Sequence, residues 1–414
     1  MLSSLTNANV LLGGLILAAL QILAALPWVY AIDPKGLRNT FRNPVNLGYA
    51  VLGFLGAGVV FALFLGYRGD SSGQQMMGRI YGAALHLQIL VDLFIYFPAF
   101  VTLLSPKMGA VALAAYREGC RQPMFWLITL AAVIATWVAV VLPYFTFGDD
   151  FKMMKQIGFD IVMLAAILFG VLASSISISE EIEGRTALTV MSKPVNRRQF
   201  LLGKFVGILM ACAAMSLLLS VNLNVALLAN PEFDQINKDN AIDPMTEEAK
   251  EIVKPAFRAL VPSGPARQFI EGTGLWFGET MANSLGILLG FGQVMILVAV
   301  TTALATRLPF IINLVIGLML YFLGHLAPVI VRVTEKVSDK ENTAVGLVRF
   351  FGNVFDTLLP ALEFFSVGPA IIREAPLSLE GFAGYVLSVS GYACIYTLIA
   401  LIVGLLLFED RDLA

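Results

Sequence analysis

The sequence predicts an all-α polytopic membrane protein with about nine transmembrane helices. Of its 414 residues, 58% are hydrophobic and only 14% are charged, whereas soluble domains carry about 25% charged residues. Uncharged apolar runs of about 20 residues recur along the chain, which is the length that a helix needs to cross about 30 Å of hydrocarbon. Alternating patterns typical of strands are absent, so helices must satisfy the backbone in lipid.

Nine apolar runs are long enough to span a bilayer. The first follows MLSSLTNAN, which carries no basic residue, so we interpret it as a span and not as a cleaved secretory signal. The expected spans are 10–31, 45–66, 81–104, 124–147, 159–179, 202–229, 283–306, 308–331 and 384–408.

The spans divide into two predicted domains. Residues 1–105 form an N-terminal region of three spans with short links, and residues 106–414 form a six-span domain with two long outer loops, 230–282 and 332–383. Residues 344–372 are apolar enough to suggest a tenth span. Their charged residues and Pro360 favour a re-entrant or interfacial helix pair instead, because irregular backbone at membrane depth needs protein or water around it.

Basic residues predict the orientation. They concentrate in alternate gaps, namely 32–44, 105–123, 180–201, Arg307 and the tail after residue 408. The positive-inside bias places these gaps in the cytoplasm. We therefore expect a multi-pass protein of the plasma (inner) membrane with a cytoplasmic C-terminus and the long loops outside.

A helix on the cytoplasmic surface is expected before the fourth span, where residues 108–123 read MGAVALAAYREGCRQP. The charged residues Arg117, Glu118 and Arg121 gather on one face, and the remaining positions are mostly apolar. Such a segment can lie in the plane of the interface. The alternative is that it is the frayed cytoplasmic end of the third span.

Charged residues also gather between the fifth and sixth spans, where residues 180–200 read EEIEGRTALTVMSKPVNRRQF. Ser177 and Ser179 come before three glutamates, and small hydroxyls ahead of carboxylates are typical of a helix start. Glu181 and Arg185 have the i,i+4 spacing that stabilises helices. The positive-inside bias alone also explains a charged cytoplasmic loop.

The short helix is expected to end near Met191, because Pro194 cannot continue it. Asn196 can cap a new helix, which begins at Arg197–Arg198 and enters the membrane at Phe200. Lys204 can extend its ammonium group to the same side. A short helix tied at both ends to spans would move both spans when force acts on it.

The run SSISISEEIEGRTALTVMSKPVNRRQFLLGKFVG at 174–207 resembles the segment after the second span of type-2 ABC exporter permeases. In that family an acidic-Gly-Arg/Thr run, a Lys-Pro and a basic pair form the loop that docks on the ATP-binding subunit. The resemblance assigns this docking role to Glu180, Glu181, Glu183, Arg185, Thr186, Lys193, Arg197 and Arg198.

The resemblance extends loosely over residues 108–414. AYREGCRQPMFWL is similar to the family's interfacial elbow helix, FGDDFKMMKQIGFD to its first outer loop, LLPALEFFSVGPA to its outer hairpin and LLLFEDRDL to its charged ending. It implies a permease subunit that exports an unidentified substrate. Residues 1–105 and the long loop 230–282 depart from the basic six-span plan.

No ATP-binding motif of the form G-x-x-x-x-G-K-[ST] occurs in the sequence. Under the resemblance, a separate ATP-binding subunit holds ATP and Mg²⁺, this chain is not itself an enzyme, and it binds no cofactor of its own. Two ATPase copies need two docking loops, so we expect a homodimer or a paired permease.

The outer loop 230–282 is expected to contain a short solvated helix, because Glu247–Lys250 and Glu251–Lys254 have i,i+3 spacing. Trp276 is expected to lie at the lipid headgroups. Deleting this loop would remove function if the chain were a non-transporting membrane scaffold or sensor subunit, which is one alternative to the permease.

Asp92 lies midway along the third span, and a carboxylate there should face protein or water. It could be a proton or cation site of an ion-coupled secondary transporter, or it could make a buried hydrogen bond. The two histidines, His86 and His325, and the three scattered cysteines do not form a metal site. A net charge of −2 gives no reason to expect a nucleic-acid partner.

Overall fold

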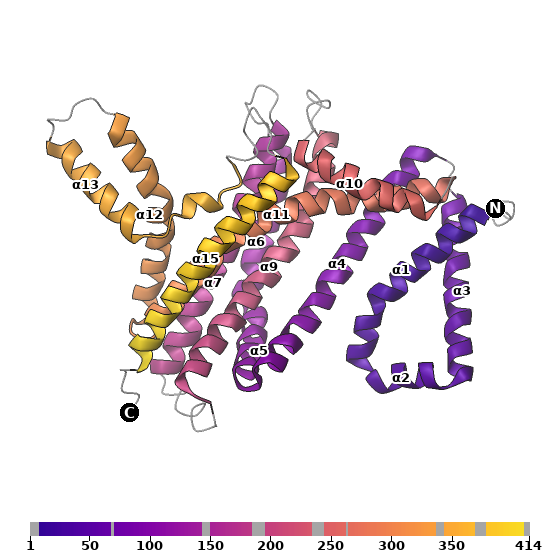
Figure 1. The fold of residues 1–414 in the computed structure, drawn as a ribbon, viewed down its shortest axis with the longest axis horizontal. Coiled ribbons are helices and arrows are strands. Elements are labelled where there is room, and N and C mark those ends of the chain that lie inside the picture. Colours follow the sequence, from indigo (N-terminus) through magenta and orange to yellow (C-terminus); the bar gives the residue numbers. More distant parts are fainter. Residues whose placement is uncertain are drawn as a thin grey trace. The chain divides into compact units, whose positions relative to one another are not determined.

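The computed structural model describes residues 8–67, 70–142, 150–183, 195–233, 244–261, 264–336, 343–368 and 378–409 (Figure 1). These residues form thirteen α-helices and one short 3-10 helix, and no strand occurs among them. Nine of these helices are long and apolar enough to cross a membrane. The predicted fold class, an all-α polytopic membrane protein, is confirmed.

Two compact units form the chain, and the first contains Met1–Ala99 and Ile242–Ser284. Its core lies where the buried side chains of Leu17, Leu65 and Phe269 meet. The elements of this unit are α1 (Ala8–Ile32), α2 (Pro34–Arg42), α3 (Pro44–Tyr67), most of α4 (Ser71–Leu104), α10 (Pro244–Leu260) and the beginning of α11 (Pro265–Ala305). Contacts thus group 242–284 with the N-terminal spans, and the predicted domain boundary after residue 105 stays a prediction.

Helix α10 is the helix expected in the loop 230–282. Lys250 lies 2.8 Å from Glu247, as the spacing predicts, and also 3.2 Å from Glu279. The predicted Glu251–Lys254 pair is not the one that forms, since Lys254 lies 3.4 Å from Glu271 on α11. Carboxylates on a helix packed against α10 therefore compete with the pairing within α10.

The prediction that Trp276 lies at the headgroups is wrong. Its side chain is fully buried in the first unit, with its indole ring 6.4 Å from the His86 ring. The cause is that α11 begins at Pro265, well before the expected span at 283. Charged residues in this first part lower its hydropathy, but it still packs as a helix.

The second unit contains Phe100–Ala241 and Leu285–Ala414. Most of α7 and α9 is buried, with 72% and 67% of their most apolar windows inside the protein, against 28% in α6, 22% in α12 and 33% in α15. The exposed faces of these three are apolar, as lipid contact requires. The elements are α5 (Pro106–Arg121), α6 (Pro123–Val141), α7 (Asp150–Glu183), α9 (Arg197–Phe233), the rest of α11, α12 (Phe310–Lys336), α13 (Thr343–Leu358), η3 (Leu362–Phe365) and α15 (Leu379–Glu409).

Residues 344–368 of the ambiguous segment 344–372 are described, and they form α13 and η3. Helix α13 has 16 residues, fewer than the roughly 20 that cross a bilayer, and it lies beside α12 (Figure 1). Glu363 forms an ion pair with Arg332 of α12. A helix pair of this kind agrees with the predicted hairpin better than with a tenth span.

Candidate functional site

The candidate site lies where the first turns of α9 pack against α5 and against the last turns of α7. Gly203, Gly207 and Ala211 follow one another at four-residue intervals along one face of α9, and small residues at this spacing let helix backbones approach closely. A side chain at Gly207 would overlap the carbonyl oxygen of Ala112 on α5, and a Cβ at Gly203 would lie 2.7 Å from the Cβ of Val111. The absence of side chains at these glycines therefore sets the contact between α5 and α9.

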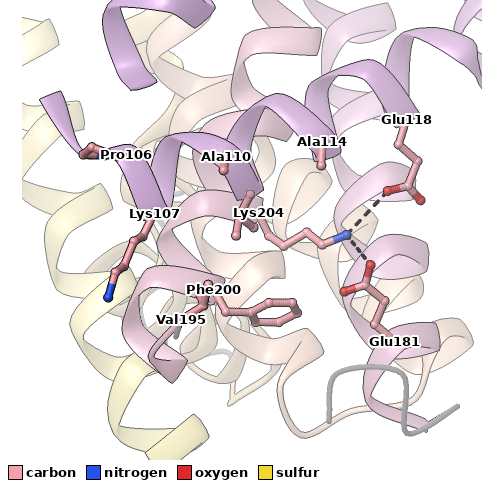
Figure 2. A pocket seen from close by; sticks show the side chains of 10 residues that line it. Pro106, Lys107, Ala110, Ala114, Glu118, Glu181, Val195, Phe200 and Lys204 are labelled. Atoms are coloured by element: carbon pink, nitrogen blue, oxygen red, sulfur yellow. Dashed lines mark hydrogen bonds and ion pairs between the residues drawn. The ribbon is translucent and has the colours of Figure 1, made fainter. Parts of the chain in front are cut away.

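Lys204 lies at the centre of this contact (Figure 2). Its Nζ donates to Glu181 Oε1 at 2.5 Å, to Ser177 Oγ at 2.9 Å and to Glu118 Oε2 at 3.5 Å. The side chain of Lys204 is only 5% exposed, whereas Glu181 is 26% and Glu118 is 47% exposed. An ammonium group has three N–H donors, so all three have an acceptor.

The Lys204 cluster (Ser177, Glu181 and Glu118 around Lys204) links three helices. Burying an unpaired cation is costly, and pairing it with a carboxylate and further hydrogen bonds offsets that cost. Ser177 and Glu181 come from the end of α7, Lys204 from the beginning of α9 and Glu118 from α5. The two helix ends that flank residues 184–194 are thus held to each other and to α5.

A pocket of about 540 Å³ opens beside the Lys204 cluster. Figure 2 shows α5 along one side of it, with Ala110 and Ala114 facing Phe200 of α9, and Lys204 reaching past them to the two carboxylates. The pocket is therefore apolar on one side and carries paired charges on the other.

Three arginines bind the C-terminal end of α15 close to the beginning of α9. Arg197 donates to the carbonyl oxygens of Phe408 and Glu409 at 3.0 and 2.9 Å, and Arg198 donates to the Glu409 carboxylate at 2.7 Å. Arg307, in the turn before α12, donates to the carbonyl of Leu407 at 2.8 Å. Cations satisfy the open carbonyls at a helix C-terminus and interact favourably with its dipole.

The segments of the second unit that the sequence places in the cytoplasm therefore contact one another. They are α5, the end of α7, the beginning of α9, Arg307 and the end of α15, joined by the bonds of Lys204, Arg197, Arg198 and Arg307. This common location agrees with the predicted orientation, which itself stays a prediction.

The predicted start of a short helix at Ser177 and Ser179 is wrong, because α7 continues unbroken from Asp150 to Glu183. Both hydroxyls are used in tertiary contacts: Ser177 Oγ accepts from Lys204 and Ser179 Oγ donates to the Leu308 carbonyl at 3.2 Å. Packing against α9 and α12 thus outweighs the local capping signal. Glu181 binds Lys204, and its predicted partner Arg185 lies outside the described residues.

The predicted start of the next helix is confirmed, since α9 begins at Arg197, directly after Asn196. The Asn196 amide N–H donates to the side chain of Gln199 at 3.2 Å. This is one half of a capping box, in which the third helical residue reaches back to the cap.

The other predicted docking residues are placed as follows. Glu180 is exposed on the last turn of α7, and Arg198 is exposed at the first turn of α9. Arg185, Thr186, Lys193 and the side chain of Glu183 lie outside the described residues. On α5, which Ser105 separates from α4, the side chains of Arg117, Glu118 and Arg121 are exposed as expected. The alternative that this segment is the frayed end of the third span is therefore wrong.

Sequence reasoning missed the central role of Lys204 and the contact of Arg307. The signal for the first was available: G-x-x-x-G-x-x-x-A at Gly203, Gly207 and Ala211 marks a close helix contact, and Lys204 follows its first glycine. Arg307 had no local signal, because its acceptor lies 100 residues away.

Asp92, the intramembrane candidate, lies in α4 of the first unit. Its residue is 9% exposed, and its Oδ1 has no hydrogen-bond partner among the described residues. The carboxyl group makes a side-chain hydrogen bond with Trp28 of α1, as the alternative to an ion site predicts. Close by in the same unit, Gln21 of α1 donates to Gln88 of α4 at 2.7 Å.

The thiol of Cys120, at the end of α5, reports on the packing of this helix. Burial raises its pKa to about 11, and a hydrogen bond with Tyr116 opposes the shift. The thiolate is the reactive form, so we expect the alkylation rate of Cys120 by iodoacetamide to rise about tenfold per pH unit from pH 7 through 9.5. An ordinary thiol with a pKa of about 8.5 reaches its plateau in this range.

The measurement is mass spectrometry of the Cys120 peptide after timed alkylation. A cysteine placed at the exposed Asn196 serves as the control thiol, and its rate should level off at lower pH than an ordinary thiol, because the N-terminus of α9 and the two neighbouring arginines favour the thiolate. A plateau for Cys120 at the same pH would mean that α5 does not bury this thiol.

Residues 120–246 match the family model described as ABC-2 family transporter protein. The match covers α6, α7 and α9, together with the segment between Glu183 and Arg197. Over this segment the match supports the resemblance to ABC-2 type permeases seen in the sequence. No curated protein matches the chain.

Proposed function

We propose that the chain is the transmembrane subunit of an ABC exporter and that its segment 184–194, with the flanking ends of α7 and α9, docks a separate ATP-binding subunit on the cytoplasmic side. ATP and Mg²⁺ are bound by that partner. The permease works as a homodimer or paired with a second permease, since two ATP-binding subunits need two docking segments.

The Lys204 cluster carries this proposal. A segment that receives force from a partner needs stiff connections to the elements that it moves, and packed side chains and ion pairs supply them. Glu181 and Ser177 bind Lys204 across the ends of α7 and α9, and Glu118 brings in α5. A push on 184–194 would therefore shift three helices together.

The docking residues fall into two groups under this proposal. Glu180 and Arg198 are exposed and available to a partner, although Arg198 also binds Glu409 within the chain. Glu181 and Arg197 act from inside: Glu181 holds Lys204, and Arg197 holds the end of α15. Their role is to position the docking segment.

Site-specific photo-crosslinking tests the docking surface. With p-benzoylphenylalanine in place of Glu180 or Asn196, we expect crosslinks in native membranes to one ATP-binding subunit, identified by its peptides. Glu380 is the matched control, because it is an exposed glutamate at the other end of α15 from Glu409, about 44 Å away at 1.5 Å per residue.

Absence of an ATP-binding protein from the Glu180 and Asn196 crosslinks, or its equal appearance at Glu380, would contradict the docking assignment. The first outcome would favour the second candidate, an ion-coupled secondary transporter. The observation behind that candidate is Asp92, because a carboxylate within a span is rare and suggests a functional site. Its Oδ1 is buried with no hydrogen-bond partner among the described residues.

A further inference from the structure

Helix α2 has a fixed geometry between two spans. Its first turn is capped by Asp33, whose Oδ1 accepts from the Gly36 amide at 2.8 Å. Its last turn ends at Asn43, whose amide donates to the Asn39 carbonyl. Only Asp33 separates α2 from α1, and only Asn43 separates it from α3. Figure 1 shows α2 lying crosswise between the ends of these two helices.

The basic residues of α2 share one face. At 3.6 residues per turn, Lys35, Arg38 and Arg42 fall within a sector of about 60°. All three side chains are exposed. Phe41, on a neighbouring sector, is 65% exposed. A short helix with a basic face beside an apolar one is suited to the interface between headgroups and acyl chains.

No partner within the described part of the chain neutralises this face. Among those residues, no carboxylate forms an ion pair with Lys35, Arg38 or Arg42. The nearest acidic residue in sequence, Asp33, is used as the helix cap. Three unpaired cations on nine residues leave a positive surface for an anionic ligand.

The depth of α2 identifies the ligand. Both neighbouring helices are long and apolar enough to cross a membrane, and linkers of one residue cannot move α2 far from the bilayer surface. An exposed aromatic residue lies beside it on α3, where Tyr49 is 70% exposed, and such residues are enriched at headgroup level. The charged groups at this depth are lipid phosphates.

We propose that α2 is a binding site for anionic phospholipid headgroups. Lys35, Arg38 and Arg42 contact the phosphates, and Phe41 inserts among the acyl chains beneath them. The proposal is independent of ATPase docking. The predicted orientation bears on it only by placing the site on the cytoplasmic leaflet, which carries the anionic lipids that attract basic segments.

Tryptophan quenching by brominated lipids tests the proposal on the full chain. The protein is reconstituted into phosphatidylcholine vesicles that contain one-fifth of either brominated phosphatidylglycerol or brominated phosphatidylcholine. The signal of Trp28 is the difference between each protein and its Trp28→Phe counterpart. Lipids are symmetric between the leaflets, so the result does not depend on orientation.

We expect quenching of Trp28 to be about threefold stronger with the brominated anionic lipid, since each basic residue near the surface attracts anionic lipid measurably. The ratio should fall to about one in the Lys35→Gln/Arg38→Gln/Arg42→Gln variant and after addition of 1 M salt, because salt screens exposed charges. These side chains are exposed, so the substitutions leave the fold intact.

A charge-matched control replaces Lys107, Arg117 and Arg121 of α5 by glutamine and should leave the Trp28 ratio near three. Equal quenching by the two brominated lipids in the native sequence would overturn the proposal. So would a preference that survives in the triple α2 variant. A ratio of one together with protection of Lys35 from amine labelling by a co-purified protein would mean that α2 binds a protein.

Discussion

Replacing Glu181 by glutamine is expected to destabilise the second unit more than any other single change in the Lys204 cluster. The substitution keeps a hydrogen-bond acceptor but removes the charge 2.5 Å from Lys204 Nζ. Removing one partner of a fully buried pair costs about 3–5 kcal/mol. Because Glu181 is 26% exposed and Glu118 remains nearby, we expect a loss of about 2 kcal/mol in the free energy of unfolding.

Lys204→Met is expected to cost less, although it removes the more deeply buried member. Methionine fills a similar volume with apolar atoms, and replacing a buried ion by an apolar residue is often nearly neutral. The two carboxylates left behind are partly exposed and can turn toward water. Glu118→Gln, at the longer contact of 3.5 Å, should change stability by less than about 1 kcal/mol, as exposed pairs do.

A double-mutant cycle tests whether Glu181 and Lys204 form an ion pair that stabilises the protein. Lys204→Met/Glu181→Gln should be about as stable as Lys204→Met alone, because the uncompensated cation is gone, which gives a coupling energy of about 1–3 kcal/mol. The measurement is unfolding in mixed detergent micelles with increasing SDS. Additive losses in the double variant would show that Glu181 and Lys204 do not form the pair.

The same variants distinguish an effect on stability from an effect on the transmission of movement from residues 184–194 to the membrane helices. If the proposed ATP-binding subunit docks at 184–194 and the cluster links this segment to α5 and α9, Lys204→Met should keep that subunit attached but reduce the stimulation of its ATP hydrolysis by the permease. This result would distinguish a mechanical role of Lys204 from a merely structural one.

Hydropathy predicted the number of spans because each segment must by itself avoid placing polar groups in lipid, so that its own residues identify it. Hydropathy did not predict the helix ends where a helix continues beyond the apolar run. Arg267, Glu271 and Glu279 interrupt the apolar pattern of α11, yet the helix includes them, since Glu271 and Glu279 pair with lysines of α10. Whether a charged residue belongs to such a helix therefore depends on ion-pair partners in another part of the sequence.

The position of the candidate site in the sequence was predictable, but the ion pairs that form it were not. Clustered charge and Pro194 marked the segment between α7 and α9, and the cap at Asn196 marked where α9 begins. The identity of each ion pair was not predictable, because Glu181 has Arg185 at favourable spacing and Lys204 at favourable tertiary distance. Sequence spacing ranks only neighbours on one helix, whereas three helices meet at Lys204.

Gly207→Ala is expected to destabilise the protein even though alanine is the better helix former. In a helix interior, the change from glycine to alanine gains about 0.5–1 kcal/mol. At Gly207 the new Cβ would overlap the Ala112 carbonyl oxygen, lie 2.7 Å from the Ala115 Cβ and lie 3.1 Å from the Ala112 carbonyl carbon. Two of these atoms are backbone, so relief requires that α5 shift as a whole, and overpacking of this kind costs about 1–3 kcal/mol.

Gly391→Ala, on α15 of the same unit, is the matched control because a Cβ there meets nothing within 4 Å. It should therefore stabilise the protein slightly, and the two identical substitutions should change the free energy of unfolding in opposite directions.

Gly207→Leu is expected to move α5 away from α9 as well as to destabilise the protein. A side chain of this size separates α5 from α9, so Cys120 loses the burial that raises its pKa, and its alkylation at pH 8 should become faster and level off near the usual thiol pKa of about 8.5. The Lys204–Glu118 contact should be lost in the same variant, so that adding Glu118→Gln to Gly207→Leu changes nothing further. If Cys120 keeps its slow alkylation in Gly207→Leu, then α5 is held by contacts other than the small-residue face of α9.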